Sequence, residues 1–380
     1  MKKTLLAAAL IAGYAGAASA QNSVTLYGVV DIGLNYQSLK AGSATPLAGT
    51  DGTANQFGLA SGVQSGSRWG LKGVEDLGNG LKANFVYESG VTVTDGSGNN
   101  GFTRQATLGL NSSSWGSVDL GRRSAPSTQQ FSGIDPFSAG FGQASLTTVI
   151  GTNFYRLSNM AMYTTPNISG FSGAVGYSFN TGLSGTPSAS TASQFGQANK
   201  SRAVSLGLRY ANGPILLAAT YDNIQANSRS TATYTNPGSY KTWALGGTYD
   251  FKVVKLHAAF AQANDGLLNN FNQITSVARG GDTNQSSAIT FVPGARTTSW
   301  MAGLSGKVGT GNAFLSIQQK IRGGTLNDLQ TGNEFGAQIG YTYPFSKRTN
   351  VYASYSYLNN AAMIQGASSN SVNLGIRHLF

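Results

Sequence analysis

The side chains that could carry acid–base or metal chemistry are scarce in this chain. Its 380 residues include 2 His and no Cys, which excludes disulfides and thiolate nucleophiles. A hydrolase would need an imidazole base, but His257 follows Lys255 with no evident serine or aspartate partner, and His378 occupies an apolar position of the last segment. Two histidines without cysteine also argue against a structural zinc or haem site. No metal or other cofactor is expected.

Ionic side chains are better represented, because 25 Lys+Arg outnumber 14 Asp+Glu and give a net charge of +11. Such an excess can mark a nucleic-acid-binding protein. Here the basic residues are scattered and form neither a basic run nor an RNA-binding motif, so no nucleic-acid partner is expected. Residues 78–83 fit the Gly-rich dinucleotide fingerprint superficially, but they form a turn between strand-like segments instead of opening a helix.

The segments that must position these charges alternate with a period of two. From Val24 to Tyr36, the apolar residues share one parity and the polar residues share the other, as in a strand with one apolar face. The same alternation recurs along the chain, for example at 81–88, 171–179, 204–210, 335–343, 351–357 and 372–380. Counted in this way, the chain contains roughly sixteen strands.

The connections between these segments alternate in length, a short one following a long one. Short turns at 75–80, 211–214 and 344–348 alternate with stretches rich in Gly, Ser, Thr and Asn, at 38–66, 181–200, 224–240, 263–296 and 359–370. This is typical of outer-membrane barrels, which have short periplasmic turns and long external loops. A sheet in hydrocarbon must close, and about sixteen strands enclose water. The predicted fold is therefore all-β, a transmembrane antiparallel β-barrel.

Strand parity then orients the charged side chains. Arg68, Glu88 and Arg156 each alternate against apolar neighbours, so we expect them to face the aqueous interior. Four lysines and arginines share this inward parity: Lys82, Arg209, Lys255 and Lys320. Basic residues on an inner wall favour anions, as Arg/Lys rings do in anion pores. The predicted function is a passive, anion-preferring channel; a barrel hydrolase or a solute-specific channel is the alternative.

The N-terminus has the features of a secretory signal peptide over residues 1–20. A basic pair at 2–3 precedes an apolar stretch at 5–18, and residues 18–20 form an A-x-A cleavage site. The chain is therefore expected to be exported and cleaved. Residues 21–380 would then form a single barrel domain.

Five stretches, taken together and in order, resemble the general porins of Gram-negative bacteria, in particular those of beta-proteobacteria. They are residues 23–31, 67–83, 120–122, 156–171 and 375–380. The resemblance covers essentially the whole mature chain. It implies an outer-membrane location, passage of small ions and hydrophilic solutes, and a homotrimer of barrels surrounded by outer-membrane lipid.

The resemblance also implies which residues narrow the channel. In this family the third external loop folds into the barrel, and here it would span about residues 124–150. Family members set a ladder of arginines against acidic residues. The matching arginines are Arg68, Arg104, Arg122 and Arg156, with Glu88 and Asp135 as the acidic partners. The final residue, Phe380, would be the signal that the barrel-assembly machinery reads.

Two of these arginines conflict with strand parity. Arg104 shares the parity of Leu108, and Arg122 that of Leu120, which points both side chains outward. A charge on the lipid face near the midplane costs about 2–4 kcal/mol. Because both match the family's arginine ladder, the resemblance implies that a bulge at the strand ends turns both side chains into the lumen. Positions at the trimer contact or at headgroup level are the alternative.

Overall fold

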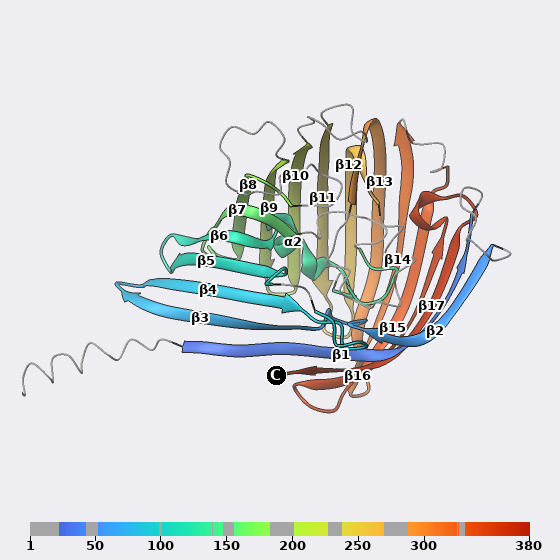
Figure 1. Cartoon of the computed structure of the whole chain (residues 1–380), viewed down its shortest axis with the longest axis horizontal. Helices are drawn as coiled ribbons and strands as arrows, with labels where there is room; N and C mark the ends of the chain where they lie inside the picture. Colours follow the sequence, from blue (N-terminus) through green and yellow to red (C-terminus); the bar gives the residue numbers. More distant parts are fainter. Residues whose placement is uncertain are drawn as a thin grey trace, which may run out of the picture.

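The computed structural model describes residues 23–42, 52–98, 101–138, 140–146, 156–182, 201–226, 238–269, 288–324, 326 and 331–380. This part of the chain is almost entirely β-sheet (Figure 1). The expected signal peptide lies outside the described residues. Among the described residues, no helix is long and apolar enough to cross a bilayer.

The sheet contains 17 strand segments within the described ranges. They are β1 (Ser23–Lys40), β2 (Thr53–Ser61), β3 (Arg68–Gly78), β4 (Leu81–Gly90), β5 (Gln105–Ser112), β6 (Gly116–Ser124), β7 (Arg156–Thr164), β8 (Phe171–Ser178), β9 (Arg202–Asn212), β10 (Ile215–Ala226), β11 (Gly238–Asp250), β12 (Lys255–Asn269), β13 (Ala288–Val308), β14 (Gly311–Gly324), β15 (Glu334–Pro344), β16 (Thr349–Asn359) and β17 (Ser368–Leu379).

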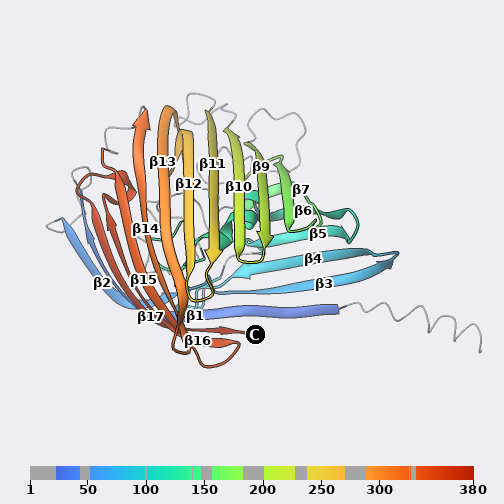
Figure 2. The same cartoon turned by 180° about the vertical axis from the view of Figure 1, so that it is seen from behind.

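The strands pair antiparallel in chain order, and the sheet closes on itself. β17 returns to β1, with Lys40 opposite Ser368 and Val29 opposite Leu379, and Figure 2 shows the strands of the rear wall. β2 and β3 occupy one barrel position, because β1 pairs with β3 through its first half and with β2 through its second half. The 17 segments therefore form a closed barrel of about sixteen strands, which confirms the predicted fold class.

The break between β2 and β3 surrounds a buried carboxylate. Asp31 is fully buried and accepts the backbone N–H groups of Gln64 at 2.9 Å and Ser65 at 2.6 Å. The Tyr352 hydroxyl donates to the same carboxylate at 2.6 Å. The chain therefore turns inward at 62–67, where a single long connection over 38–66 was expected, and then resumes pairing along β1.

The two faces of the barrel wall differ as the alternation predicts. Leucines on the outer parity are more than half exposed, as Leu26, Leu108 and Leu208 show at 59 to 65 %. A closed barrel in a bilayer needs this apolar outer band. Aromatic pairs mark the strand ends beside short turns, including Tyr249 with Phe251 and a matching pair at 343 and 345. They form an interfacial girdle.

The connection after β6 folds into the barrel, as predicted for the third external loop. It contains the helix α2 (Pro126–Phe131) and the 3-10 turn η1 (Ser132–Ile134), and Figure 1 shows α2 inside the curve of the strands. The loop is described as far as residue 146, so the end of the expected 124–150 segment lies outside the described residues. A second 3-10 turn, η3 (Ala361–Met363), lies between β16 and β17.

Candidate functional site

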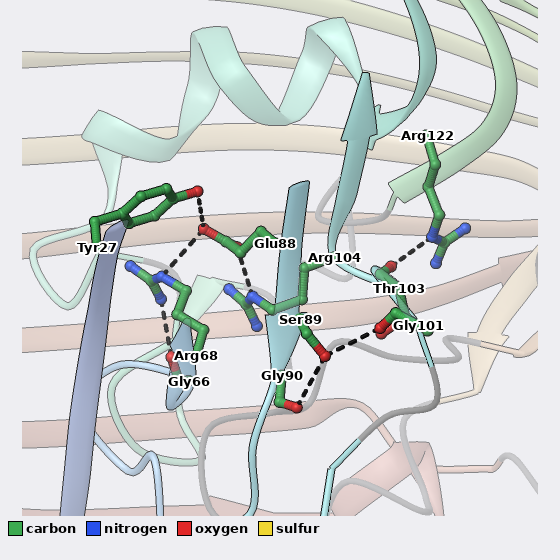
Figure 3. A network of polar contacts seen from close by, with 10 residues as sticks. All are labelled: Tyr27, Gly66, Arg68, Glu88, Ser89, Gly90, Gly101, Thr103, Arg104 and Arg122. Carbon is green, nitrogen blue, oxygen red and sulfur yellow. Dashed lines mark hydrogen bonds and ion pairs between the residues drawn. The ribbon is translucent and has the colours of Figure 1, made fainter. Parts of the chain in front are cut away.

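Two arginines share one glutamate on the inner face of β3, β4 and the segment before β5. Arg104 donates from Nε to Glu88 Oε1 at 2.7 Å, and Arg68 Nε lies 3.5 Å from the other oxygen, Oε2. Figure 3 shows the carboxylate between the two guanidinium groups. Arg68 is the more exposed of the two side chains, at 27 % against 8 %. Of these two guanidinium groups, Arg68 is therefore the more accessible to water.

Strand register positions Glu88 for this role. Gly70 of β3 lies opposite Glu88 of β4, and Tyr27 of β1 lies opposite Gly70 on its other side. A Cβ on Gly70 would lie 2.8 Å from the Tyr27 hydroxyl, so glycine leaves room for the ring. The Tyr27 hydroxyl can therefore cross this position and donate to Glu88 Oε2 at 3.0 Å.

Arg104 lies on the same face as Glu88 because the ladder is irregular at this point. Glu88 pairs with Gln105 in the strand register, yet the Arg104 N–H also donates to the Glu88 carbonyl at 3.1 Å. Two residues thus oppose one, which is the arrangement of a β-bulge. The bulge brings Arg104 to the same face as Glu88, although alternation along β5 points it toward lipid.

Arg122 also sits at an irregularity, since the β6–β7 register shifts between Gly121 and Arg123. Its Nε donates to the Thr103 carbonyl at 2.5 Å and its Nη1 donates to Ser158 Oγ at 2.7 Å. Figure 3 places this guanidinium beside Thr103, away from Glu88. Arg122 therefore ties the second external loop to β7 in addition to carrying charge.

Arg156 begins β7 opposite Ser124, where the third loop leaves the wall. Strand parity predicts that its neighbour Leu157 faces lipid. Instead, Leu157 is fully buried in a cluster with Ala125 of the loop. Asn159 has a positive φ of 48°, which breaks the alternation of β7 at this end. The strict period of two therefore fails around Arg156.

Asp135 stabilises the turn of the inserted loop. Its Oδ1 accepts the N–H of Phe137 at 2.9 Å and its Oδ2 accepts the N–H of Leu146 at 2.8 Å. The side chain is buried. The carboxylate thus joins both ends of the stretch 135–146, whereas the ion pairs of Glu88 with Arg68 and Arg104 lie elsewhere on the wall.

The inserted loop lies on the barrel wall through apolar contacts. Phe131 and Ile134 are fully buried against small wall residues such as Ala244 and Ala259. A Cβ on Gly246 would lie 2.8 Å from the Phe131 ring, so glycine is needed there. The tip of the loop packs in a second buried cluster, which contains Ala60, Val63, Phe137, Phe141 and Tyr352.

Polar residues of the wall also hold the inserted loop, through hydrogen bonds to its backbone. Gln338 accepts the N–H of Ala144 at 3.0 Å and donates to the carbonyl of Phe141. His257 bonds the Ile134 carbonyl through Nδ1 at 2.9 Å and Ser305 through Nε2 at 2.8 Å. This serine was missed in the sequence, because it lies on β13 and only the strand register brings it to His257. The histidine bridges wall and loop.

A charged pair on β6 was also missed. Arg123 Nη1 contacts Asp119 Oδ2, and Asn84 donates to Asp119 Oδ1 at 3.2 Å. Parity could have found both residues, because Val118 and Leu120 beside Asp119 are exposed on the lipid face.

The C-terminal residue extends the closing ladder. Phe380 and Gly28 exchange two backbone hydrogen bonds, each 3.1 Å long. A Cβ on Gly28 would collide with the Phe380 ring, so this glycine leaves space for the aromatic side chain. The ring stays partly exposed on the outer face.

Comparison with known proteins agrees with this geometry. The family model described as Gram-negative porin matches residues 6–362. The chain is 42 % identical to an outer membrane porin protein of Bordetella pertussis and 32 % identical to outer membrane porin protein 32 of Delftia acidovorans, over 100 % of each chain. Its fold is similar to the solved anion-selective porin from Comamonas acidovorans, with a TM-score of 0.68, 26 % identity, and coverage of 95 % and 100 % of the two chains.

A closed barrel with an apolar outer band and a polar, charged inner wall can carry water and small solutes across a membrane without chemistry. The inserted loop and the Arg68–Glu88–Arg104 cluster lie on the inner side of this wall. With this geometry and a family match over nearly the whole chain, the protein belongs to the Gram-negative porin family and is a passive channel of the outer membrane.

Proposed function

We propose that the channel prefers small anions and that the Arg68–Glu88–Arg104 cluster carries this preference. The observation behind the proposal is that two guanidinium groups share one carboxylate, so the cluster keeps a net positive charge. Arg68, the more exposed of the two, can contact a hydrated anion while its ion pair with Glu88 keeps the guanidinium in place. Fixed positive charge around a water-filled pore raises the local anion concentration.

Further positive groups extend this surface. Arg122 and Arg156 lie on the neighbouring strands β6 and β7 near the external end, and we assign them to the approach to the constriction. We assign Glu88 the role of acidic partner and Asp135 the role of shaping the loop segment 124–150. The anion-selective porin from Comamonas acidovorans has the same fold and is 26 % identical, which supports anion preference here.

The proposal includes assembly and processing. Family membership supports a homotrimer in outer-membrane lipid, formed from a mature domain of residues 21–380 after removal of the signal peptide 1–20. Phe380 would be read by the barrel-assembly machinery, and its exposed ring at the end of the closing ladder suits this role. Deletion of Phe380 should lower the amount of inserted barrel while export continues. Normal insertion of the truncated chain would contradict this assignment.

We also propose that the protein has no catalytic role. The serine–histidine pair formed by Ser305 and His257 is the arrangement that most resembles a hydrolase site. However, the second ring nitrogen bonds the neutral Ile134 carbonyl of the loop, where a hydrolase triad would hold a carboxylate. The pair is accordingly assigned to loop anchoring. Turnover of an ester or lipid substrate that disappears in Ser305→Ala would contradict this.

A planar-bilayer recording of the purified porin in a salt gradient tests the proposal. We expect stepwise current increases in groups of three and a reversal potential of the sign that anion permeation gives. A cation-selective reversal potential would overturn the anion preference. Absence of conductance steps from a folded, inserted barrel would overturn the open channel itself.

A further inference from the structure

A second ion pair lies on the inner wall outside the Arg68–Glu88–Arg104 cluster. On β6, Arg123 Nη1 contacts Oδ2 of Asp119, four residues earlier, and the two side chains are 17 % and 9 % exposed. The pair is thus mostly removed from water but is not sealed from the lumen. An ion pair of this kind is screened by salt less than an exposed one.

Strand register places Arg123 at the level of the cluster. Glu88 of β4 pairs with Gln105 of β5, and the next residue of β5, Ala106, pairs with Arg122 of β6. Arg123 follows Arg122 directly, one residue beyond this ladder, and so lies beside the row formed by Glu88 and Gln105. Residues directly opposite one another in a sheet share a face, so this row lies on one side of the wall.

That side is the lumen. Val118 and Leu120, which flank Asp119, are exposed on the outer face at 38 % and 57 %, whereas Asp119 is buried on the opposite face. Asn84, two strands away, donates to Asp119 Oδ1 at 3.2 Å, and its own parity matches Glu88. The Asp119 carboxylate therefore lies on the inner face of the wall, at the level of Asn84, which precedes Glu88 by four residues on β4.

The structure holds both charges in fixed positions. A Cβ on Gly109, opposite Asp119 in the β5–β6 register, would collide with Asp119 Oδ1, so the glycine makes space for the carboxylate. Arg123 Nη2 donates to Gln129 Oε1 of α2 at 3.3 Å. The Gln129 amide in turn donates to the Ser124 carbonyl at 2.8 Å. Arg123 is thus held between Asp119 of the barrel wall and Gln129 of α2.

We propose that Asp119 is a specificity-determining residue of the pore, because its pairing with Arg123 limits the anion preference. A paired carboxylate and guanidinium act on a distant ion only as a dipole. Without the carboxylate charge, Arg123 would add a full positive charge at the level of Glu88. This role of Asp119 rests on the proposed function, because a limit on anion preference has physiological meaning only in a channel that prefers anions.

The test is the Cl⁻ to K⁺ permeability ratio of Asp119→Asn, measured from reversal potentials at about 0.1 M salt. The amide keeps the shape of the side chain and removes its charge. A unit charge about 8 Å from an ion in water changes the local concentration of that ion about two-fold. Because Cl⁻ rises and K⁺ falls, the ratio should increase by about two- to four-fold.

A matched control is Asp250→Asn, which makes the same charge change in an exposed pair with Lys255 at the end of β11. It should shift the ratio by clearly less than Asp119→Asn does. The double variant Asp119→Asn with Arg123→Gln should return close to wild type, since it removes both charges. Gly109→Ala, which displaces the carboxylate without changing charge, should move the ratio in the same direction as Asp119→Asn by a smaller factor.

Electrophoresis of heated and unheated samples confirms that each barrel is folded. An unchanged or lowered ratio in folded Asp119→Asn, or a shift equal to that of Asp250→Asn, would overturn the inference. These results are distinguishable from failure of the proposed function. If the wild-type channel prefers cations, the anion proposal fails, yet a rise of the Cl⁻ to K⁺ ratio in Asp119→Asn still supports the masking of Arg123.

Discussion

The inner wall of this porin has two regions that share the same strand geometry but differ in their side chains: one carries charged groups and the other packs against the inserted loop. On β3 to β6, charged side chains such as Arg68 and Glu88 stand on the wall and keep contact with lumen water. Around β10 to β16, glycine and alanine predominate at the contact, and the inserted loop covers the wall with buried aromatic rings. By strand order, β11 to β14 lie about half a turn around the barrel from β3 to β6.

The difference shows how a barrel combines a filter with a rigid constriction. Charges that act on solutes must reach the lumen water, and within the cluster Arg68 is the more exposed guanidinium, at 27 %. The loop, in contrast, is held by dry packing and by bonds to buried amides such as Gln338. Selectivity and stability are therefore expected to respond to mutations in different regions.

The largest effect on the loop region should come from Phe137→Ala. Phe137 is almost fully buried, and its ring centroid lies 5.7 Å from those of Phe141 and Phe314. Removal of a buried Phe side chain costs about 3–5 kcal/mol, which would loosen the loop tip while the strand ladder persists. We expect larger and noisier single-channel currents in recordings from bilayers. Phe345→Ala, at an exposed girdle position, is the control and should leave the currents unchanged.

A smaller effect in the same region is expected from Gln338→Ala. This change removes the acceptor of the Ala144 N–H and the donor to the Phe141 carbonyl. Buried backbone groups left without partners cost about 1–3 kcal/mol. Proteolysis of the inserted barrel within residues 135–146 should become faster, whereas the Cl⁻ to K⁺ ratio should stay the same. A change in selectivity equal to that of an arginine variant would show that the two regions are not separate.

The smallest effect should follow Tyr27→Phe in the charged region. The variant removes the hydroxyl that donates to Glu88 Oε2 at 3.0 Å but leaves both arginines beside the carboxylate. Loss of one hydrogen bond to a partly hydrated charge changes stability by about 1 kcal/mol. The permeability ratio should shift slightly and single-channel noise should not change. Tyr36→Phe, on the outer parity of β1, is the control.

Much of this architecture could be predicted from alternation, and its failures have physical causes. Arg68 and Glu88 follow parity because they sit on regular parts of β3 and β4. Arg104 departs from parity because a bulge lies opposite Glu88, and a local bulge leaves no mark on an alternating pattern. The loop assigned to 263–296 proved shorter, since β13 begins at Ala288; beyond the bilayer both faces of a strand are polar and the alternation disappears.

The inserted loop shows a second limit of sequence reasoning. Its inward course was expected only from the family resemblance. The small residues that receive it, such as Gly246, Ala259 and Gly303, lie on the neighbouring strands β11, β12 and β13, and only the strand register brings them together. The same holds for Ser305 beside His257. The break between β2 and β3 also depends on residues far apart in the chain, since Tyr352 donates to Asp31.

The most direct test of the charge filter is the reversal potential of Arg68→Ser with Arg104→Ser in a KCl gradient. This double variant leaves Glu88 on the wall without its two ion-pair partners, so the cluster changes from net positive to net negative. At about 0.1 M salt the anion preference should be lost, and the difference from wild type should shrink near 1 M, where the Debye length falls to about 3 Å. A folded double variant that keeps the wild-type reversal potential at low salt would contradict the central claim.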